Sequence, residues 1–134
     1  MPGVRYVDLE TLLAESDVVS LHTPLTEETR GLMNEKRIGL MKKNAVLINT
    51  ARGPVVDSDA LAGALKEGRI AGACIDVFEN EPPVRKDHPL FSAPNTIVTP
   101  HVAFATKEAL VKRAVIVFDN VVNYLDGTPR NVIG

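Results

Sequence analysis

The chain has 134 residues, 45% of them hydrophobic and 24% charged, which is typical of one globular domain. Its net charge of −2 gives no reason to expect a nucleic acid or an anionic membrane as a partner. No apolar run approaches the roughly 20 residues that cross a bilayer. The first five residues, 1–5, lack the apolar core of a signal peptide, and one cysteine excludes an internal disulfide, so we expect a cytoplasmic protein.

Short apolar runs alternate with helical patterns along the chain. The helical patterns cover 9–16, 34–41 with Asn34 as cap, 57–68 with Asp57 or Ser58 as cap and Gly68 at the end, and 106–127 with Thr106 as cap. The apolar runs predict strands at 18–22, 45–49, 70–77 and 96–99, of which 45–49 should be buried on both faces. Residues 82–94 are rich in turn formers and predict a loop. This order predicts an α/β fold, a parallel sheet with flanking helices and right-handed crossovers.

Polar residues follow the strands, at the edge of a parallel sheet where ligands bind. Arg52 comes after the second predicted strand, Asp76 and Glu81 after the third, and His101 after the fourth. An arginine offers a planar fork that matches a carboxylate, and a histidine beside a carboxylate can exchange a proton with a hydroxyl or carbonyl oxygen. Such a set suits the interconversion of a hydroxy acid and a keto acid, which also requires a hydride acceptor that these residues do not identify.

Four ordered stretches carry a resemblance to a known family. They are Ser20–Thr26 (SLHTPLT), Leu47–Gly53 (LINTARG), Ile75–Pro82 (IDVFENEP) and Thr99–His101 (TPH). Together they resemble the D-isomer-specific 2-hydroxyacid dehydrogenases from about Val7 to the end of the chain. Four motifs at matching intervals are far more specific than any one of them.

The resemblance implies roles for individual residues. Arg52 would bind the substrate carboxylate, Glu81 would support the histidine, and His101 would be the catalytic acid and base. The cofactor-binding residues it implies are Thr23, Pro24, Thr29, Thr50, Ala51, Arg52 and Asp76. No metal site is implied. The cofactor is NAD as the family default, with NADP as the alternative, and the substrate is a small 2-hydroxy or 2-keto acid.

The chain also departs from the family pattern. Family members are more than twice as long and carry a substrate domain and a G-x-G-x-x-G loop, and no stretch of these 134 residues fits that fingerprint. We therefore interpret 1–134 as a single partial NAD(P)-binding, Rossmann-like (doubly wound) domain that lacks its first two strands. Alone it should bind NAD weakly and be weakly active or inactive, because the pyrophosphate loses its helix N-terminus. A homodimer, another homo-oligomer or a swapped partner should cover the exposed sheet edge.

Other interpretations remain open on the sequence alone. Arg52 suits a surface arginine, His101 a hydrogen-bonded core histidine and Glu81 a solvated loop charge. His22 is interpreted as structural and His88 as a loop residue. The whole chain could instead be a non-catalytic binding or dimerisation module derived from the same scaffold. A flavodoxin-like or receiver-like domain is a third hypothesis, but the first predicted strand lacks the acidic cluster or phosphate loop that it requires.

Overall fold

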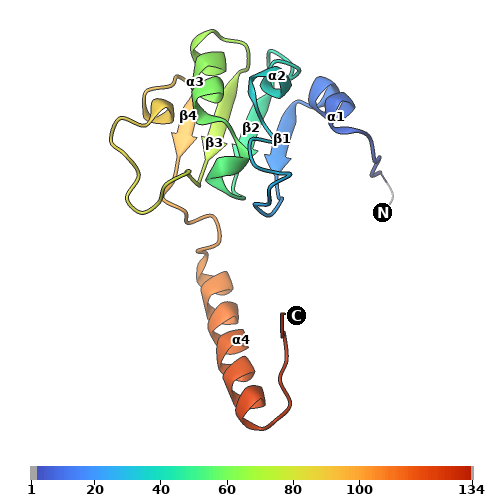
Figure 1. Ribbon diagram of the computed structural model, residues 1–134, viewed down its shortest axis with the longest axis vertical. Helices are drawn as coiled ribbons and strands as arrows, with labels where there is room; N and C mark the ends of the chain where they lie inside the picture. The colour runs from blue at the N-terminus through green and yellow to red at the C-terminus, as the bar shows by residue number, and fades with distance from the viewer. Residues whose placement is uncertain (1–2, 134) are drawn as a thin grey trace. The chain divides into compact units, whose positions relative to one another are not determined.

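A computed structural model describes residues 3–133 of the chain (Figure 1). The chain divides into two compact units, Met1–His101 and Val102–Gly134. Residues 1, 2 and 134 lie outside the described residues, although the predicted domain spans 1–134. Residues 1 and 2 also belong to the segment 1–5 that was expected not to be a signal peptide.

The first unit is a four-stranded parallel sheet with helices between its strands, as the sequence predicts. Its strands lie in the order β1-β2-β3-β4, which is also their order along the chain. The strands are β1 (Val18–Leu21), β2 (Val46–Asn49), β3 (Gly72–Ile75) and β4 (Thr96–Val98). The α-helices are α1 (Leu9–Glu15), α2 (Glu35–Ile38) and α3 (Ser58–Lys66), and the short 3₁₀ helices are η1 (Gly53–Val55) and η2 (Pro89–Phe91).

Side-chain caps fix where the helices begin. Asp8, Asn34 and Asp57 each accept a hydrogen bond from the backbone N–H three residues further on. Asp57, not Ser58, is therefore the cap of α3. The helix after Asn34 is shorter than predicted, because the N–H of Met41 bonds to a carbonyl only three residues back and the α-helical ladder is not continued.

The hydrophobic core lies on one face of the sheet. The strand register aligns Val19 with Leu47 and Ala73, and all three are buried together with the helix residues Leu13 and Leu61. The opposite face is more open within this unit: Val18 is 57% and Ile97 65% exposed, and Val46 and Ile48 are half-buried. The expectation that 45–49 is buried on both faces is therefore wrong for the described structure, because α1, α2 and α3 all contribute to the same core cluster.

The segment 82–94, predicted as a loop, has a fixed internal structure. It contains η2, in which Leu90 is 1% exposed and belongs to the core. His88 caps η2 and is itself half-buried. This segment therefore packs against the sheet and can hold neighbouring residues in place.

The second unit consists of α4 (Lys107–Leu125) and the residues around it. Thr106 caps the helix and Gly127, at φ +72°, follows its end, as the sequence predicts. Within this unit taken by itself, the apolar residues that recur at helical spacing form no buried face: Leu110 is 46% and Leu125 76% exposed. No helix among residues 3–133 is both long and apolar enough to cross a membrane.

Gly53 permits the closest backbone approach in the first unit and leads to a stability prediction. A Cβ at Gly53 would lie 1.9 Å from the carbonyl carbon of Phe78, whereas a Cβ at Gly63, inside α3, would meet nothing within 4 Å. Gly53→Ala should therefore lower the free energy of unfolding by about 1–3 kcal/mol, and Gly63→Ala should raise it by about 0.5–1 kcal/mol. Urea denaturation followed by circular dichroism measures both. A Gly53→Ala protein as stable as the parent would contradict the close approach.

Candidate active site

The turn after β2 is shaped by a buried asparagine. Asn49 is 1% exposed; its side-chain oxygen accepts the N–H of Ala51 at 3.0 Å, and its amide nitrogen donates to the carbonyl of Arg52 at 3.0 Å. The buried amide thus holds the backbone at both residues before the chain enters η1. This role of Asn49 was not predicted, although an asparagine two and three residues before such a turn is itself a sequence signal for it.

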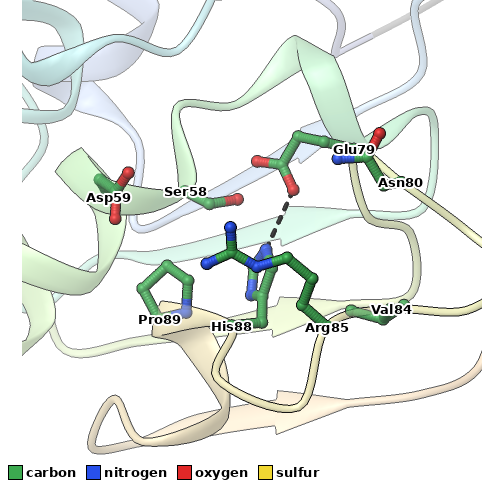
Figure 2. A pocket seen from close by; sticks show the side chains of 8 residues that line it. All are labelled: Ser58, Asp59, Glu79, Asn80, Val84, Arg85, His88 and Pro89. Atoms are coloured by element: carbon green, nitrogen blue, oxygen red, sulfur yellow. Dashed lines mark hydrogen bonds and ion pairs between the residues drawn. The ribbon is translucent and has the colours of Figure 1, made fainter.

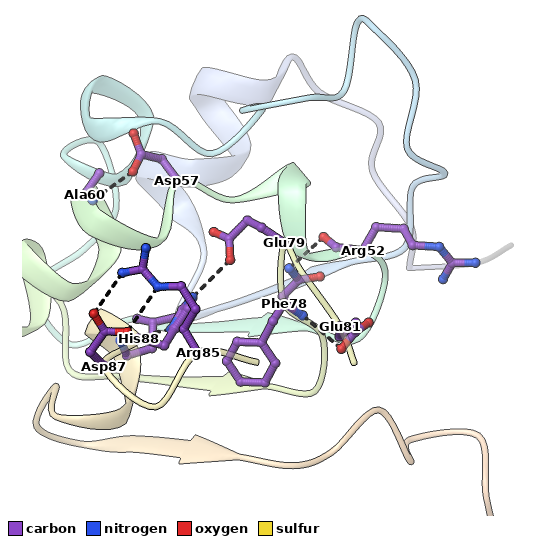
Figure 3. A network of polar contacts seen from close by, with 11 residues as sticks. Arg52, Asp57, Ala60, Phe78, Glu79, Glu81, Arg85, Asp87 and His88 are labelled. Carbon is purple, nitrogen blue, oxygen red and sulfur yellow. Dashed lines mark hydrogen bonds and ion pairs between the residues drawn. The ribbon is translucent and has the colours of Figure 1, made fainter. Parts of the chain in front are cut away.

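Arg52 stands on this turn with its side chain in solvent. Its guanidinium donates one hydrogen bond, from Nη1 to the carbonyl of Ala51, at 2.6 Å. Figure 3 shows the side chain extending away from the turn that carries Phe78 and Glu81. The structure therefore places Arg52 just beyond the carboxyl end of β2, the edge at which ligands generally bind parallel α/β sheets, and outside the hydrogen-bonded pair of Glu81 and His101.

Glu81 and His101, twenty residues apart, form a hydrogen-bonded pair. Oε1 of Glu81 lies 2.7 Å from Nδ1 of His101, and Oε2 accepts the backbone N–H of Phe78 at 3.3 Å. The Glu81 side chain is 21% exposed and the His101 side chain 41%. The predicted proximity of the two residues is thus observed, and Glu81 rather than Glu79 contacts His101.

The backbone of His101 adopts a conformation that the sequence did not indicate. Its φ is +55°, in the left-handed region that side chains other than glycine seldom occupy. The N–H of His101 donates to the carbonyl of Asp76 at 2.8 Å, which holds this conformation at the end of the unit. The carboxylate of Asp76, 3% exposed, accepts a hydrogen bond from the hydroxyl of Thr99 at 2.5 Å. Asp76 therefore connects the end of β3 to the end of β4 through hydrogen bonds with Thr99 and His101.

A pocket of about 430 Å³ lies against the Glu81–His101 pair. It is lined by Phe78, Glu81, Pro82, Val84, Pro100 and His101. Ligand pockets in proteins fall within this size range and combine a mostly apolar wall with a few polar groups. The histidine and the carboxylate are the polar groups here, which suits a small organic substrate that exchanges a proton.

The threonines after β1 differ in what their hydroxyls do. The Thr29 hydroxyl donates to the carbonyl of Pro24 at 2.7 Å and accepts the N–H of Thr26 at 2.8 Å, so it holds the turn together. The buried Thr23 hydroxyl has no hydrogen-bond partner within residues 3–133. A buried polar group without a partner is unusual, and this one lies at the edge where ligands bind such sheets.

A second polar cluster, of His88 and Glu79, was not predicted from the sequence. His88 Nε2 lies 3.0 Å from Oε2 of Glu79, and the two side chains face each other in a pocket of about 190 Å³ (Figure 2). Burial works against the charge on Glu79, but hydrogen bonds from Ser58 and His88 outweigh it and hold the pKa of Glu79 below its ordinary value. His88 lies in the loop just before η2, as predicted, but its side chain is only 11% exposed and so belongs to the packed part of the site region. His22, read as structural, bonds to the hydroxyl of Ser20 at 2.8 Å.

Comparison with known proteins places this geometry in a family. Residues 1–103 match the family described as "D-isomer specific 2-hydroxyacid dehydrogenase, NAD binding domain". The chain belongs to this family. It is 53% identical over 127 residues to a glyoxylate reductase of Thermofilum pendens, an alignment that covers 95% of this chain and 37% of that protein. The chain thus spans well under half the length of that curated relative, and the family membership displaces the flavodoxin-like alternative.

Solved structures agree with the fold. A crystal structure of a D-isomer-specific 2-hydroxyacid dehydrogenase from Lactobacillus delbrueckii in its NAD-complexed form matches with a TM-score of 0.88 and 36% identity, over 99% of this chain and 44% of that one. An acyclic imino acid reductase in complex with NADPH and D-Arg matches with a TM-score of 0.90 and 38% identity, over 100% of this chain and 42% of that one. The α/β class and the likeness to an NAD-binding domain are therefore confirmed.

The lowered pKa of Glu79 predicts how stability depends on pH. A glutamate with a depressed folded pKa stabilises the fold above its unfolded value, here 4.5, and loses that contribution as the pH falls through the folded value. Glu79→Gln should therefore be about 0.5–1 kcal/mol less stable than the parent at pH 7, a small figure because the carboxylate is partly screened by solvent. The difference should shrink below pH 4.5. Urea denaturation at a series of pH values measures it, and a difference that grew on acidification would contradict the assignment.

Proposed function

We propose that this chain carries the catalytic half of a D-2-hydroxyacid dehydrogenase, which interconverts a small 2-keto acid and its D-2-hydroxy acid. The observation that supports this most is the 2.7 Å contact between Glu81 and His101 beside a pocket of about 430 Å³. The family membership adds the reaction class. The binding-module alternative has no comparable observation for a pure binding role, since a carboxylate–histidine pair is not needed to dimerise.

His101 is the proposed acid and base. Because a carboxylate oxygen of Glu81 faces Nδ1, the proton of the neutral ring is held at Nδ1 and Nε2 becomes the atom that exchanges a proton with substrate. In the direction of reduction, the protonated ring gives its Nε2 proton to the carbonyl oxygen of the keto acid. In the direction of oxidation, Nε2 takes the hydroxyl proton, and the charge of Glu81 stabilises the resulting imidazolium.

Arg52 is the proposed anchor for the substrate carboxylate. A guanidinium can donate two parallel hydrogen bonds to a carboxylate, which fixes the orientation of the keto acid as well as its position. The exposed guanidinium has one described hydrogen bond, to its neighbour's carbonyl, so it can turn toward a bound anion. The relatives named glyoxylate reductase and D-lactate dehydrogenase indicate short 2-keto acids as the substrate class.

The residues at the strand ends fit a nicotinamide cofactor. The partnerless hydroxyl of Thr23 lies beyond β1, the backbone of Thr50 and Ala51 beyond β2, and Asp76 beyond β3. Together with Pro24, Thr29 and Arg52 these residues would hold it. A bound nicotinamide would supply or accept the hydride at the substrate carbon while His101 handles the proton. We propose NAD, with NADP as the alternative because one structural relative is a complex with NADPH.

A chimera tests the catalytic proposal. Residues 1–134 would replace the matching segment of the Thermofilum pendens glyoxylate reductase, which supplies the length of the relative that this chain does not span. The chimera should oxidise NADH with glyoxylate. His101→Ala should lower kcat by about 10²–10⁴-fold, as expected for loss of a general acid. Arg52→Lys should mainly raise KM, because a lysine cannot make the two parallel bonds.

The matched control is His22→Ala, which removes an exposed histidine whose ring lies 2.8 Å from the hydroxyl of Ser20. It should leave kcat within about twofold, as most exposed substitutions do. A folded, NADH-binding His101→Ala chimera that kept full turnover would contradict the proposal. So would a His22→Ala chimera that lost as much activity as the His101 variant.

We also propose that the chain forms a homo-oligomer through α4. Within the second unit taken by itself, no residue of the helix is buried, and its exposed side chains include Leu110, Val117, Phe118, Val121 and Leu125. A helix that is apolar on much of its surface is stable in water only when another surface covers it. A second copy provides the same apolar helix, so two helices can cover each other symmetrically. The β1 edge of the described sheet is a second place where a copy could pair.

Light scattering coupled to size exclusion tests the association. The parent chain should elute as a dimer or larger at micromolar concentration, and Val117→Glu combined with Val121→Glu should shift it to monomer by placing charges in the covered surface. Glu108→Gln, at the exposed start of the same helix, is the control and should keep the parent's mass. A monomeric, folded parent chain would contradict the proposal.

A further inference from the structure

His88 contacts the turn that carries Glu81. The His88 ring packs edge-on against Phe78, with centroids 5.0 Å apart and planes at 84°, and its Nε2 lies 3.0 Å from the Glu79 carboxylate. Phe91 packs against the same two rings, at 5.4 Å from Phe78 and 5.6 Å from His88. His88 thereby contacts the two residues that open the turn, Phe78 and Glu79 (Figure 3).

The other side of this turn reaches His101. The backbone N–H of Phe78 donates to Oε2 of Glu81, and Oε1 of Glu81 lies 2.7 Å from Nδ1 of His101. Phe78 is 5% exposed, so its position is fixed by what packs around it. A continuous set of contacts therefore runs from His88 through Phe78 and Glu81 to His101, entirely within the first unit.

We propose that His88 is a positioning residue: by holding Phe78 and Glu79 it directs the Glu81 carboxylate onto Nδ1 of His101 and so keeps the ring proton on that nitrogen. The inference rests on the proposed function for its catalytic meaning. The position of the proton on the His101 ring can be measured without any turnover. Loosening the turn would let Glu81 swing away, and the neutral His101 ring would then be able to carry its proton on either nitrogen.

The structure predicts opposite proton positions for the two rings. The N–H of Leu90 points to Nδ1 of His88 at 3.4 Å, so that nitrogen is an acceptor and the proton lies on Nε2, facing Glu79. In His101 the carboxylate faces Nδ1, so the proton lies there. The chain has three histidines, so their imidazole resonances can be assigned by comparing single-histidine variants.

The test is imidazole ¹⁵N NMR of the full chain, recorded at a series of increasing alkaline pH values until the imidazole resonances stop changing, so that the rings are neutral. His88→Leu removes both the edge-on ring and the donor to Glu79. We expect the ratio of Nδ1-protonated to Nε2-protonated His101 to fall by roughly tenfold, which corresponds to about 1.4 kcal/mol. His88→Gln keeps a donor for Glu79 and should restore part of the ratio.

General destabilisation is separated by a core control. Leu13→Val trims a fully buried side chain in α1, at the β1 end of the sheet, and should lower stability while leaving the His101 proton on Nδ1. If His88→Leu fails to fold, Glu79→Ala decides, because that side chain is 32% exposed and its loss leaves the core intact. A reduced ratio in a folded variant supports the inference.

An unchanged ratio in folded His88→Leu, or in Glu79→Ala where the first does not fold, overturns it. So does an equal loss in Leu13→Val. The result is separable from the proposed function. A ratio that falls in the His88 variant while the chimera fails to turn over would support the positioning role and contradict the dehydrogenase assignment. An unchanged ratio with an active chimera would contradict the positioning role of His88 and support the dehydrogenase assignment.

Discussion

The turn that follows β3 is the constraint on which the site depends. At its start, Asp76 joins the sheet edge twice: its N–H donates to the carbonyl of Asn49 at 3.0 Å, and its carbonyl accepts the N–H of His101 at 2.8 Å. Its middle meets Gly53 so closely that no Cβ fits there. Its end carries Glu81 to His101. The ends of β2, β3 and β4 thus share one short segment, and the polar groups of three strands converge without a long loop.

Backbone packing and chemistry are joined at this segment. The turn bearing Arg52 and the turn bearing Glu81 touch through Gly53 and Phe78, so a shift of one displaces the other. Buried hydrogen bonds from Asn49 and Asp76 set these backbones before any ligand arrives. A proton-transferring pair needs such preorganisation, because small misplacements of reacting groups are costly in rate.

Much of this could be predicted from the sequence, and the reasons for the exceptions are physical. Strand positions and caps follow from local patterns, which is why Asn34, Asp57 and Thr106 begin helices as expected. The meeting of Glu81 with His101 was expected from the resemblance and from strand-end geometry. The left-handed backbone of His101 and the burial of His88 were not foreseen, because both depend on contacts between segments distant in the sequence. The one-sided burial of β2 likewise depends on which face of the sheet the helices pack against.

The most direct test of the account is whether a nicotinamide cofactor binds at the carboxyl ends of the strands. NADH would be titrated to millimolar concentration into the ¹⁵N-labelled chain, with amide chemical shifts followed by NMR, a method that detects the weak binding expected of this segment alone. The account predicts shifts concentrated at Thr23, Ala51, Asp76 and His101, which lie at or beyond the strand ends. No shifts at millimolar NADH, or shifts confined to α4 or to the opposite edge of the sheet, would contradict it.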